Sequence, residues 1–481
     1  MITKDLLDKI KGYDLYNNDL APFPYEKRTI TPFGLGATWF GLSVTLAAFM
    51  LFAQFMQWLT ITEMLWAAAV GYIILAIIGT LTQEIGIIYG ISLPATLRAQ
   101  FGYAGSKVMS VIKLPSAGFW AGFNTYLGGT ALNEVFKLTT GFDSILVAMI
   151  IFGAVSILII FNAAEILAKF NAIVSPILLI IFAYIAILLF RNFDVNFVET
   201  FSMGGDDSLS FIGKLDKFML CVMSAMGTWL GVSMAMQNIT RECKAEPKNF
   251  NSWWQTNKKF SIGEFLGMAP PMIALGYLGG VSYVLTGEYN PIIVITDTVG
   301  AQSTAVAVIC QIFICFAIWS TNGGANILTS AFLLCNIFKK ANLRVMSIVF
   351  LIVVCLFKPW ALTGFLPQVV TFLGSIVSPM CGIMIIDYYV IRKRKFSLDD
   401  MYRSDGKYHY DKGHNWGAWI AYIGSVLVMQ IGPIKSYSLL IGLAISMVVY
   451  YQLMKFWVLK KHPEAMEEDV PFPEYEEEVI K

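Results

Sequence analysis

The feature that most constrains this chain is a series of twelve long apolar stretches. Each is near or above the ~20 residues that an α-helix needs to cross the hydrocarbon core of a membrane. Of the 481 residues, 57% are hydrophobic and 14% are charged, which is too apolar for a soluble domain. The chain is therefore predicted to be an all-α polytopic membrane protein with twelve transmembrane helices. The stretches cover residues 33–57, 62–89, 106–136, 143–163, 168–190, 215–237, 261–285, 300–334, 343–357, 362–391, 415–432 and 436–458.

The positions of the basic residues predict the orientation of these helices. If the N-terminus is cytoplasmic, most of the 34 Lys and Arg residues fall in inner segments, as the positive-inside rule requires. Both termini are therefore expected in the cytoplasm, with the chain in the cell membrane, and the span count is expected to be even. The formal net charge of +1 suggests no nucleic-acid partner.

A short motif occurs twice, each time in the first apolar stretch of a set of five. Residues 38–43 read Thr-Trp-Phe-Gly-Leu-Ser, and residues 228–233 read Thr-Trp-Leu-Gly-Val-Ser. Gly-interrupted apolar segments at matching places in two halves indicate a transporter with inverted repeats and broken helices at its substrate site. The alternative is that the motif recurs by chance in an apolar chain. The span count supports the repeat, because with an odd number of spans per set the second set enters the membrane from the opposite side and is inverted.

These patterns predict a five-plus-five inverted repeat, with helices one and six broken, followed by two C-terminal helices. The predicted parts are a cytoplasmic N-terminal arm (1–32), the first five-helix repeat (33–200), the second repeat (201–392), a cytoplasmic loop (393–414), helices eleven and twelve (415–459) and an acidic cytoplasmic tail (460–481).

Span three carries the first polar cluster at membrane depth. Trp120 and Asn124 are four residues apart and share one helix face. An indole beside an amide suits a flat, hydrogen-bonding heterocycle, because the ring stacks while the amide pairs with ring N–H and C=O groups. The alternative is an Asn bonded to a neighbouring helix beside a packing Trp. The residues alone leave both interpretations open.

Span eight carries the second cluster. Asn322 and Asn326 share a face, and Ser320 and Thr321 supply hydroxyl oxygens that suit a hard cation such as Na⁺. Backbone carbonyls from an unwound span one would complete such a site. The alternative is that both hydroxyls bond to carbonyls of their own helix.

The third cluster is the second copy of the repeated motif, where Trp229 provides another aromatic wall and polar residues follow near the inner end. Intramembrane acids are sparse, and Glu84, Glu264 and Asp387 are all expected near cytoplasmic span ends. The sequence shows no series of acidic residues inside the membrane that could relay protons, which favours Na⁺ coupling over proton coupling. All three histidines fall in loops or the tail, which argues against an enzyme.

Several segments together resemble the first nucleobase–cation symporter family, the permeases for hydantoin, allantoin, cytosine, uracil, purines and thiamine. The resemblance covers essentially the whole chain. It rests on Asn18–Pro22 with Glu26–Thr29, Tyr89–Pro94 with Arg98 and Phe101–Gly102, Trp319–Asn322 with Ala325–Asn326, and Pro379, Gly382, Asp387–Tyr388 and Arg392.

This resemblance implies a bundle that works by alternating access and a set of binding residues. Trp120 and Trp229 would stack on the two faces of the substrate. Hydrogen bonds to its edge would come from Asn124, Asn322 and Asn326, with Thr45 adding a contact from span one. The Na⁺ site would use the carbonyls of Gly41, Val44 and Ala317 and the hydroxyls of Ser320 and Thr321.

The chain also departs from the hydantoin-type pattern of the family. Asn124 stands where that pattern has Gln, Thr45 replaces a longer amide, Thr228 stands where a second Trp is found, and Asn238 occupies a place often held by Asp. Shorter side chains change how far each donor reaches, so the substrate is not identified by the resemblance.

The sequence thus predicts a Na⁺-coupled importer of a nucleobase or related ureide, working as a monomer and without a cofactor. A proton-coupled version and an amino-acid or amine transporter on the same scaffold are the main alternatives. The paired tryptophans and neutral amides favour an uncharged flat ligand over an amino acid. An intramembrane enzyme and a channel are weaker alternatives.

Overall fold

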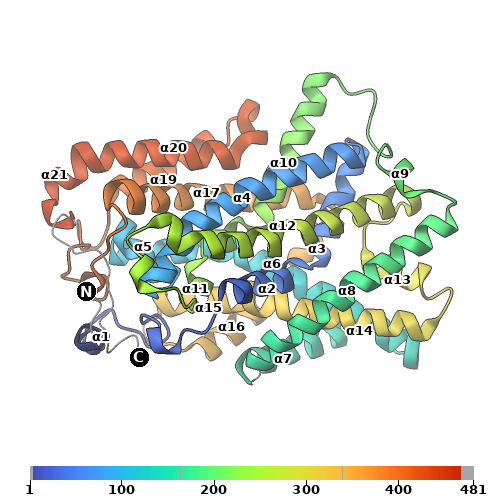
Figure 1. The fold of residues 1–481 in the computed structure, drawn as a ribbon, viewed down its shortest axis with the longest axis horizontal. Coiled ribbons are helices and arrows are strands. Elements are labelled where there is room, and N and C mark those ends of the chain that lie inside the picture. The colour runs from blue at the N-terminus through green and yellow to red at the C-terminus, as the bar shows by residue number, and fades with distance from the viewer. Residues whose placement is uncertain (1–3, 163, 339, 467–481) are drawn as a thin grey trace.

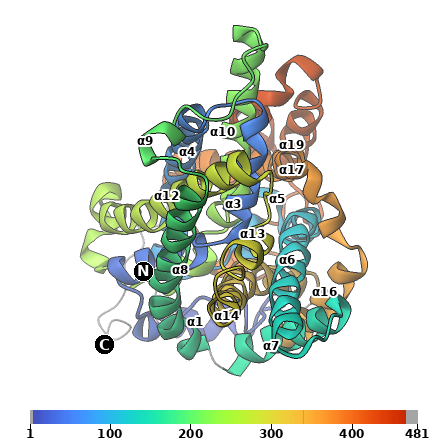
Figure 2. The same ribbon diagram turned by 90° about the vertical axis from the view of Figure 1, so that its right-hand side faces the viewer.

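The computed structural model describes residues 4–162, 164–338 and 340–466. Within these ranges the regular structure is helical, and strand-like pairing is limited to isolated bridges such as Ile30 with Cys243. The long helices run roughly along the longest axis of the molecule (Figure 1) and pack around one another in the end-on view (Figure 2). This arrangement is expected of a chain in lipid, because a helix satisfies its own backbone hydrogen bonds.

Each of the twelve apolar stretches coincides with one or more helices. In chain order the longer elements are α2 (Pro32–Ser43), α3 (Leu46–Ala53), α4 (Ile61–Tyr89), α5 (Leu93–Phe101), α6 (Tyr103–Thr140), α7 (Ile145–Asn162), α8 (Ala164–Asn192), α10 (Phe211–Ser233), α12 (Trp253–Thr286), α13 (Pro291–Thr298), α14 (Thr304–Thr321), α15 (Leu328–Ile337), α16 (Leu343–Leu356), α17 (Leu366–Ile386), α19 (Trp416–Val428) and α20 (Ser438–Leu453).

Judged by their length and apolar composition, fewer helices of the structure qualify as membrane spans than the twelve predicted from the sequence. Among the described residues, six helices are long and apolar enough to span a membrane, or up to eight if each of two bent pairs is one span. The shorter apolar helices include α16 and α19. Two helices were missed in the sequence: α5, which follows span two, and α13, which precedes span eight. The protein is thus a multi-helix bundle, and twelve crossings stay a prediction.

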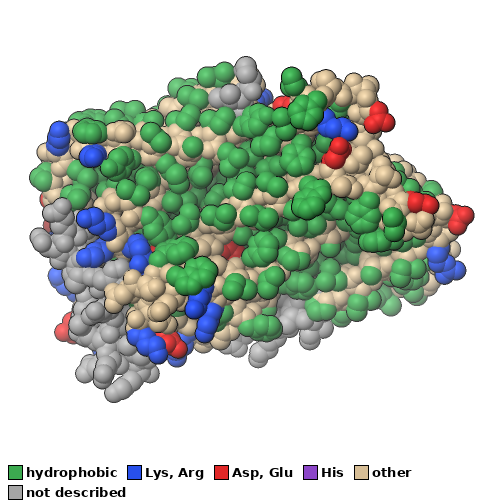
Figure 3. Space-filling model, turned by 45° about the horizontal axis from the view of Figure 1, so that its top comes forward, with side chains coloured by type: hydrophobic (Ala, Val, Ile, Leu, Met, Phe, Trp, Pro, Cys, Tyr) green, Lys and Arg blue, Asp and Glu red, His purple; other side chains and the backbone are tan. Residues whose placement is uncertain are grey.

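The two ends of the bundle differ in charge. The first and last described helices, α1 (Lys4–Ile10) and α21 (Leu459–Lys461), lie at the same end, and α9 (Phe197–Thr200) and α13 lie at the other (Figure 1). In the space-filling view hydrophobic side chains cover the middle of the visible face, and Lys and Arg gather toward the end that carries α1 and α21 (Figure 3). The end helices α1 and α21 therefore lie at the more basic end of the bundle.

The first apolar stretch is a broken helix. The helix α2 ends at Ser43, the helix α3 begins at Leu46, and the two axes differ by 55°. At the break Thr45 has an extended backbone, and its hydroxyl accepts a hydrogen bond from the Ala47 N–H as an N-cap. The backbone therefore leaves the helical ladder within the bundle, where polar groups need a partner.

The second copy of the motif ends its helix in the same way. The helix α10 stops at Ser233, a turn covers residues 234–236, and α11 (Gln237–Thr240) follows. Each copy thus ends on the last residue of an α-helix, and Trp39 contacts Trp229 edge-on with ring centroids 5.5 Å apart. The second break is milder, because residues 211–240 form a single candidate span.

Glycines on α12 allow the broken helix to pack closely. A Cβ at Gly263 would lie 2.5 Å from the Pro32 carbonyl oxygen, and a Cβ at Gly267 would overlap the Gly36 carbonyl. Further along α12, a Cβ at Gly279 would overlap the backbone of α3. In lipid the hydrophobic effect does not drive helices together, and small residues instead allow the close backbone contacts that hold them. The helix α12 therefore holds both halves of the broken helix.

Candidate functional site

A cavity of about 40 Å³ lies in the bundle between α6 and α10, beside the break between α2 and α3. Its lining includes five of the six predicted substrate residues: Thr45, Trp120, Asn124, Trp229 and Asn326. Thr321, from the predicted cation site, also lines it. Since about 10–15 Å³ suffices for one water on this measure, the cavity is smaller than a heterocycle and must widen to accept one.

The two predicted stacking residues come from different helices. Trp120 on α6 is 8% exposed, and Trp229 on α10 is 4% exposed. Trp120 is braced edge-on by Phe119 and Phe123, at centroid distances of 5.3 and 5.9 Å. Trp229 is braced by Trp39. These contacts hold each indole, so that its rotamer need not be ordered by the ligand.

Asn124 has the arrangement expected of a ligand-binding amide. Its side chain lines the cavity, and its Oδ1 is buried without a hydrogen-bond partner in the described structure. A buried carbonyl oxygen left unpaired is costly, and a ligand N–H would satisfy it. This geometry opposes the alternative in which Asn124 is bonded to a neighbouring helix.

Asn322 lies behind the cavity and ties two helices together. Its Nδ2 donates to the Ala121 carbonyl and to Thr125 Oγ1, both on α6 and both at 3.1 Å. Its Oδ1 accepts a bond from Asn326 Nδ2 at 3.3 Å, and Asn326 does line the cavity. In this arrangement Asn322 positions Asn326 and α6, whereas the sequence predicted that it contacts the substrate directly.

The two asparagines lie in a π-helical segment, residues Asn322–Ile327, between α14 and α15. Gly323 and Gly324 fall inside it. Such wide turns inside an α-helix are frequently found at functional sites, because they shift side chains out of the regular ladder. The sequence showed the polar cluster but gave no signal for the π-helical geometry.

One of the predicted cation ligands, Thr321, contacts the end of α2. Thr321 Oγ1 donates to the Leu42 carbonyl at 3.3 Å, which joins span eight to the broken span one. Because the Thr45 N–H bonds the Ser43 carbonyl, the Gly41 carbonyl loses the donor that a continuous helix would provide. The Ala48 N–H likewise bonds Thr45, which leaves the Val44 carbonyl without its helical donor.

Hydroxyl groups complete this oxygen-rich region. Ser320 Oγ and Ser43 Oγ are both buried without a hydrogen-bond partner among the described residues. Carbonyl and hydroxyl oxygens are the ligands that hard cations prefer. The residues present therefore fit a Na⁺ ion, and Ala317 lies one helical turn before Thr321 on the same helix.

Lys113 is a cavity residue that sequence reasoning did not assign to the site. It lies on α6, is 2% exposed and lines the cavity, together with Ser116, Thr228 and Met272. The signal for it was present, because Lys113, Ser116, Trp120 and Asn124 recur at the spacing of one helix face. The sequence interpretation counted Lys113 only among the 34 Lys and Arg residues and gave it no role in the site.

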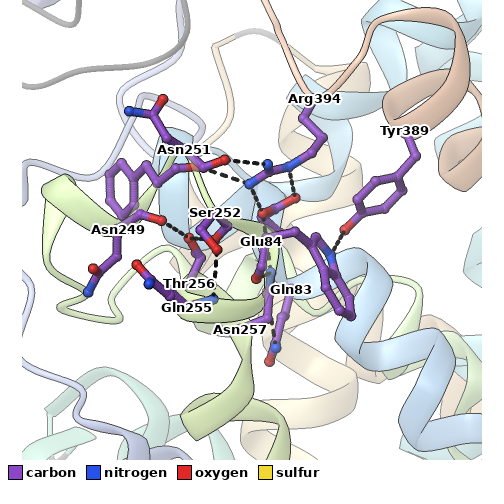
Figure 4. A network of polar contacts seen from close by, with 12 residues as sticks. Gln83, Glu84, Asn249, Asn251, Ser252, Gln255, Thr256, Asn257, Tyr389 and Arg394 are labelled. Atoms are coloured by element: carbon purple, nitrogen blue, oxygen red, sulfur yellow. Dashed lines mark hydrogen bonds and ion pairs between the residues drawn. The ribbon is translucent and has the colours of Figure 1, made fainter.

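Figure 4 shows a network of polar contacts that includes Glu84, Asn257, Tyr389 and Arg394. The Glu84 carboxylate of α4 is paired with the Arg394 guanidinium, with Nε donating at 3.0 Å, and accepts from Asn257 Nδ2 of α12 at 3.2 Å. Trp253 Nε1 donates to the Tyr389 hydroxyl at 3.0 Å. This network links α4, α12 and the segment after α17.

Asp387 forms a second buried cluster. It accepts from Arg392 Nε at 2.7 Å, from Gln100 Nε2 at 2.9 Å and from the Tyr450 hydroxyl at 2.8 Å. Buried charges need such partners, because an unpaired ion in lipid is costly. Glu264 on α12 is different: it is fully buried, and neither of its carboxyl oxygens has a hydrogen bond in the described structure.

Comparisons with known proteins agree with this geometry. Residues 22–458 match the family of permeases for cytosine/purines, uracil, thiamine and allantoin. The hydantoin permease of Microbacterium maritypicum is 34% identical over 93% of this chain and 90% of its own. The allantoin permease of Bacillus subtilis (strain 168) is 26% identical over 94% of each chain.

Solved structures give the same result. Mhp1, a nucleobase-cation-symport-1 family transporter in a closed conformation with bromovinylhydantoin bound, superposes with a TM-score of 0.87 at 33% identity, over 94% of this chain and 97% of its own. A Na⁺-coupled sialic acid symporter shares the fold at 14% identity, over 94% of this chain and 96% of its own, with a TM-score of 0.60. The chain belongs to the nucleobase–cation symporter family of permeases; it is a multi-pass membrane transporter and not an enzyme.

Proposed function

We propose that this protein imports a planar, hydrogen-bonding heterocycle of the nucleobase, hydantoin or ureide type together with Na⁺ across the cell membrane. The observation that carries the proposal is the cavity itself. Two braced indoles, Trp120 and Trp229, line it with the free amide oxygen of Asn124, beside the hydroxyl of Thr321 at the helix break.

The substrate side of the proposal follows from the lining. A flat ring stacks between indoles that the protein already holds in place, and each stacked aromatic pair contributes about 1–3 kcal/mol. Asn124 and Asn326 present amide groups toward the cavity, and Thr45 adds a hydroxyl. The names of the relatives, a hydantoin permease and an allantoin permease, support the same chemical class.

The cation side follows from the break in span one. Na⁺ would be held by the carbonyls of Gly41, Val44 and Ala317 and by the hydroxyls of Ser320 and Thr321. An ion at that place joins span one to span eight, and the cavity is next to it. Binding of Na⁺ would stabilise the substrate-receptive state, so that the sodium gradient drives uptake.

The proposed architecture is two sets of five spans in inverted orientation, followed by two more, with both termini cytoplasmic. The matching ends of α2 and α10 support it, because both copies of the repeated motif end their helices beside the cavity. Alternating access would then be a movement of one set of helices against the other around the ligand.

Glu264 favours a second candidate, the proton-coupled version of the same transport. Its unpaired, fully buried carboxyl is a group that could carry a proton through the cycle. An amino-acid substrate is less well matched, because no acidic residue is among those lining the cavity that could pair with an ammonium group.

Uptake into proteoliposomes tests the proposal. A labelled panel of uracil, cytosine, hypoxanthine, allantoin, a hydantoin and thiamine would be offered with an inward Na⁺ gradient, with an inward proton gradient, or with neither. Uptake of one compound that collapses without Na⁺ is the expected result. Uptake that follows pH alone would assign coupling to the proton. Uptake of none of these compounds and of none of their carboxylate derivatives would refute the substrate class.

A further inference from the structure

Lys113 places a single positive charge in the wall of the cavity. It occupies the same face of α6 as Trp120 and Asn124, since residues seven and eleven positions apart return to one side of a helix. All three side chains line the cavity. The ammonium group is therefore part of the surface that a ligand between the two indoles would meet.

Nothing in the described structure neutralises this charge. Among the described residues Lys113 has no side-chain hydrogen-bond or ion-pair partner, and no Asp or Glu is among the residues that line the cavity. Its side chain is 2% exposed, so the ammonium does not reach the membrane surface as lysines near helix ends do. By contrast, the buried Arg392 is paired with the Asp387 carboxylate, and the half-buried Arg394 with the Glu84 carboxylate.

The opposite wall leaves room for the ammonium group. Gly231, in the second copy of the repeated motif, faces α6: a Cβ added there would lie 4.0 Å from Lys113 Nζ and 3.5 Å from Ser116 Oγ. A larger side chain at this position would cover the ammonium. The glycine therefore keeps Lys113 accessible from the cavity, next to Trp229.

A buried, unpaired ammonium is strongly unfavourable, and a ligand that supplies the missing negative charge removes this penalty. We infer that the substrate is an anionic planar heterocycle, carrying a carboxylate or an ionised acidic ring N–H that pairs with Lys113. This inference rests on the proposed function and changes the expectation that the ligand is uncharged. A ligand with one negative charge would neutralise the positive charge of Lys113.

Paired ligands that differ in charge test the inference on the purified full-length protein. The pairs are uracil with uracil-6-carboxylate, and hydantoin with hydantoin-5-acetate, measured by equilibrium binding in the presence of Na⁺. For at least one pair the wild-type protein is expected to bind the carboxylate about tenfold or more tightly than the neutral parent, as a charge-assisted hydrogen bond in a desolvated site implies.

Substitutions then locate the effect. Lys113→Met is expected to lower affinity for the carboxylate about tenfold or more while the neutral parent changes less than about threefold. Lys113→Arg should keep the preference for the anion. Lys107→Met, on the same helix but outside the cavity lining, is the control and should bind both ligands as the wild type does.

The outcomes separate this inference from the proposed function. A wild-type protein that binds the neutral parents as tightly as the carboxylates, or a Lys113→Met variant that loses affinity for both equally, would overturn the anionic substrate and leave the heterocycle transporter standing. If neither member of any pair binds, and the uptake panel is also negative, both fail. The wild-type comparison decides the matter even if Lys113→Met does not fold.

Discussion

Replacement of Trp120 by alanine should weaken substrate binding strongly. The indole lines the cavity on α6 and is held edge-on by Phe119 and Phe123, so the substrate stacks on a ring that is already ordered. Loss of one stacking face costs about 1–3 kcal/mol. At 1.4 kcal/mol for each tenfold change, this corresponds to a dissociation constant about 5- to 150-fold higher.

Stability must be separated from binding in this experiment. Trp120→Ala removes a nearly buried indole, and such truncations cost about 3–5 kcal/mol of folding free energy. Trp419 on α19 is a matched control, because it is 9% exposed against 8% for Trp120 and packs on Phe101 away from the cavity. Trp419→Ala should lower the melting temperature to a similar extent.

Equilibrium binding of the transported compound and thermal unfolding would be measured for the wild type and both variants in the same detergent. The expected pattern is a large loss of affinity in Trp120→Ala and near wild-type affinity in Trp419→Ala. If Trp120→Ala binds within about twofold of the wild type, the indole is a packing residue and the stacking role is refuted.

Four further substitutions follow from the site and its surroundings. Thr321→Ala should raise the Na⁺ concentration needed for half-maximal uptake, since it removes one of the proposed ligands; an unchanged Na⁺ response would move the cation elsewhere. Asn124→Leu should raise the dissociation constant about tenfold, because one hydrogen bond in a desolvated site is lost while the volume is kept; unchanged affinity would assign Asn124 to packing. Arg394→Gln leaves the buried Glu84 carboxylate without its ion-pair partner and should lower the free energy of unfolding by about 3–5 kcal/mol, seen as a lower melting temperature. Gly267→Val should prevent α12 from approaching α2, with little folded protein recovered by size-exclusion chromatography; normal recovery would show that the backbones can separate.

The bundle was largely predictable because a membrane imposes a simple rule on sequence. Apolar stretches long enough to span lipid must be helices, and each of the twelve stretches coincides with helical structure. The repeated motif also predicted that the first apolar stretch is a broken helix, and the structure has a 55° bend between α2 and α3. The helices α5 and α13 were missed because they are short and their sequences resemble loops.

The sequence predicted which types of residue gather at the site, but it predicted their individual roles less well. Trp120, Asn124 and Trp229 line one cavity as the sequence indicated. Asn322 was expected to contact the substrate; in the structure its amide donates to α6, and it lies in a π-helical segment that no sequence pattern signals. Lys113 was overlooked because the prediction of topology only counts how many lysines lie on each side of the membrane. The importance of Lys113 depends instead on the side chains that surround it in the cavity.

The central claim is that the ligand cavity and the helix break bind two ligands that favour each other. The direct test is the affinity of the purified protein for the transported heterocycle as NaCl replaces KCl at constant ionic strength and pH. The account predicts that affinity rises at least about fivefold with Na⁺, and that substrate raises Na⁺ affinity by the same factor. Equal affinity in Na⁺ and K⁺ would contradict it.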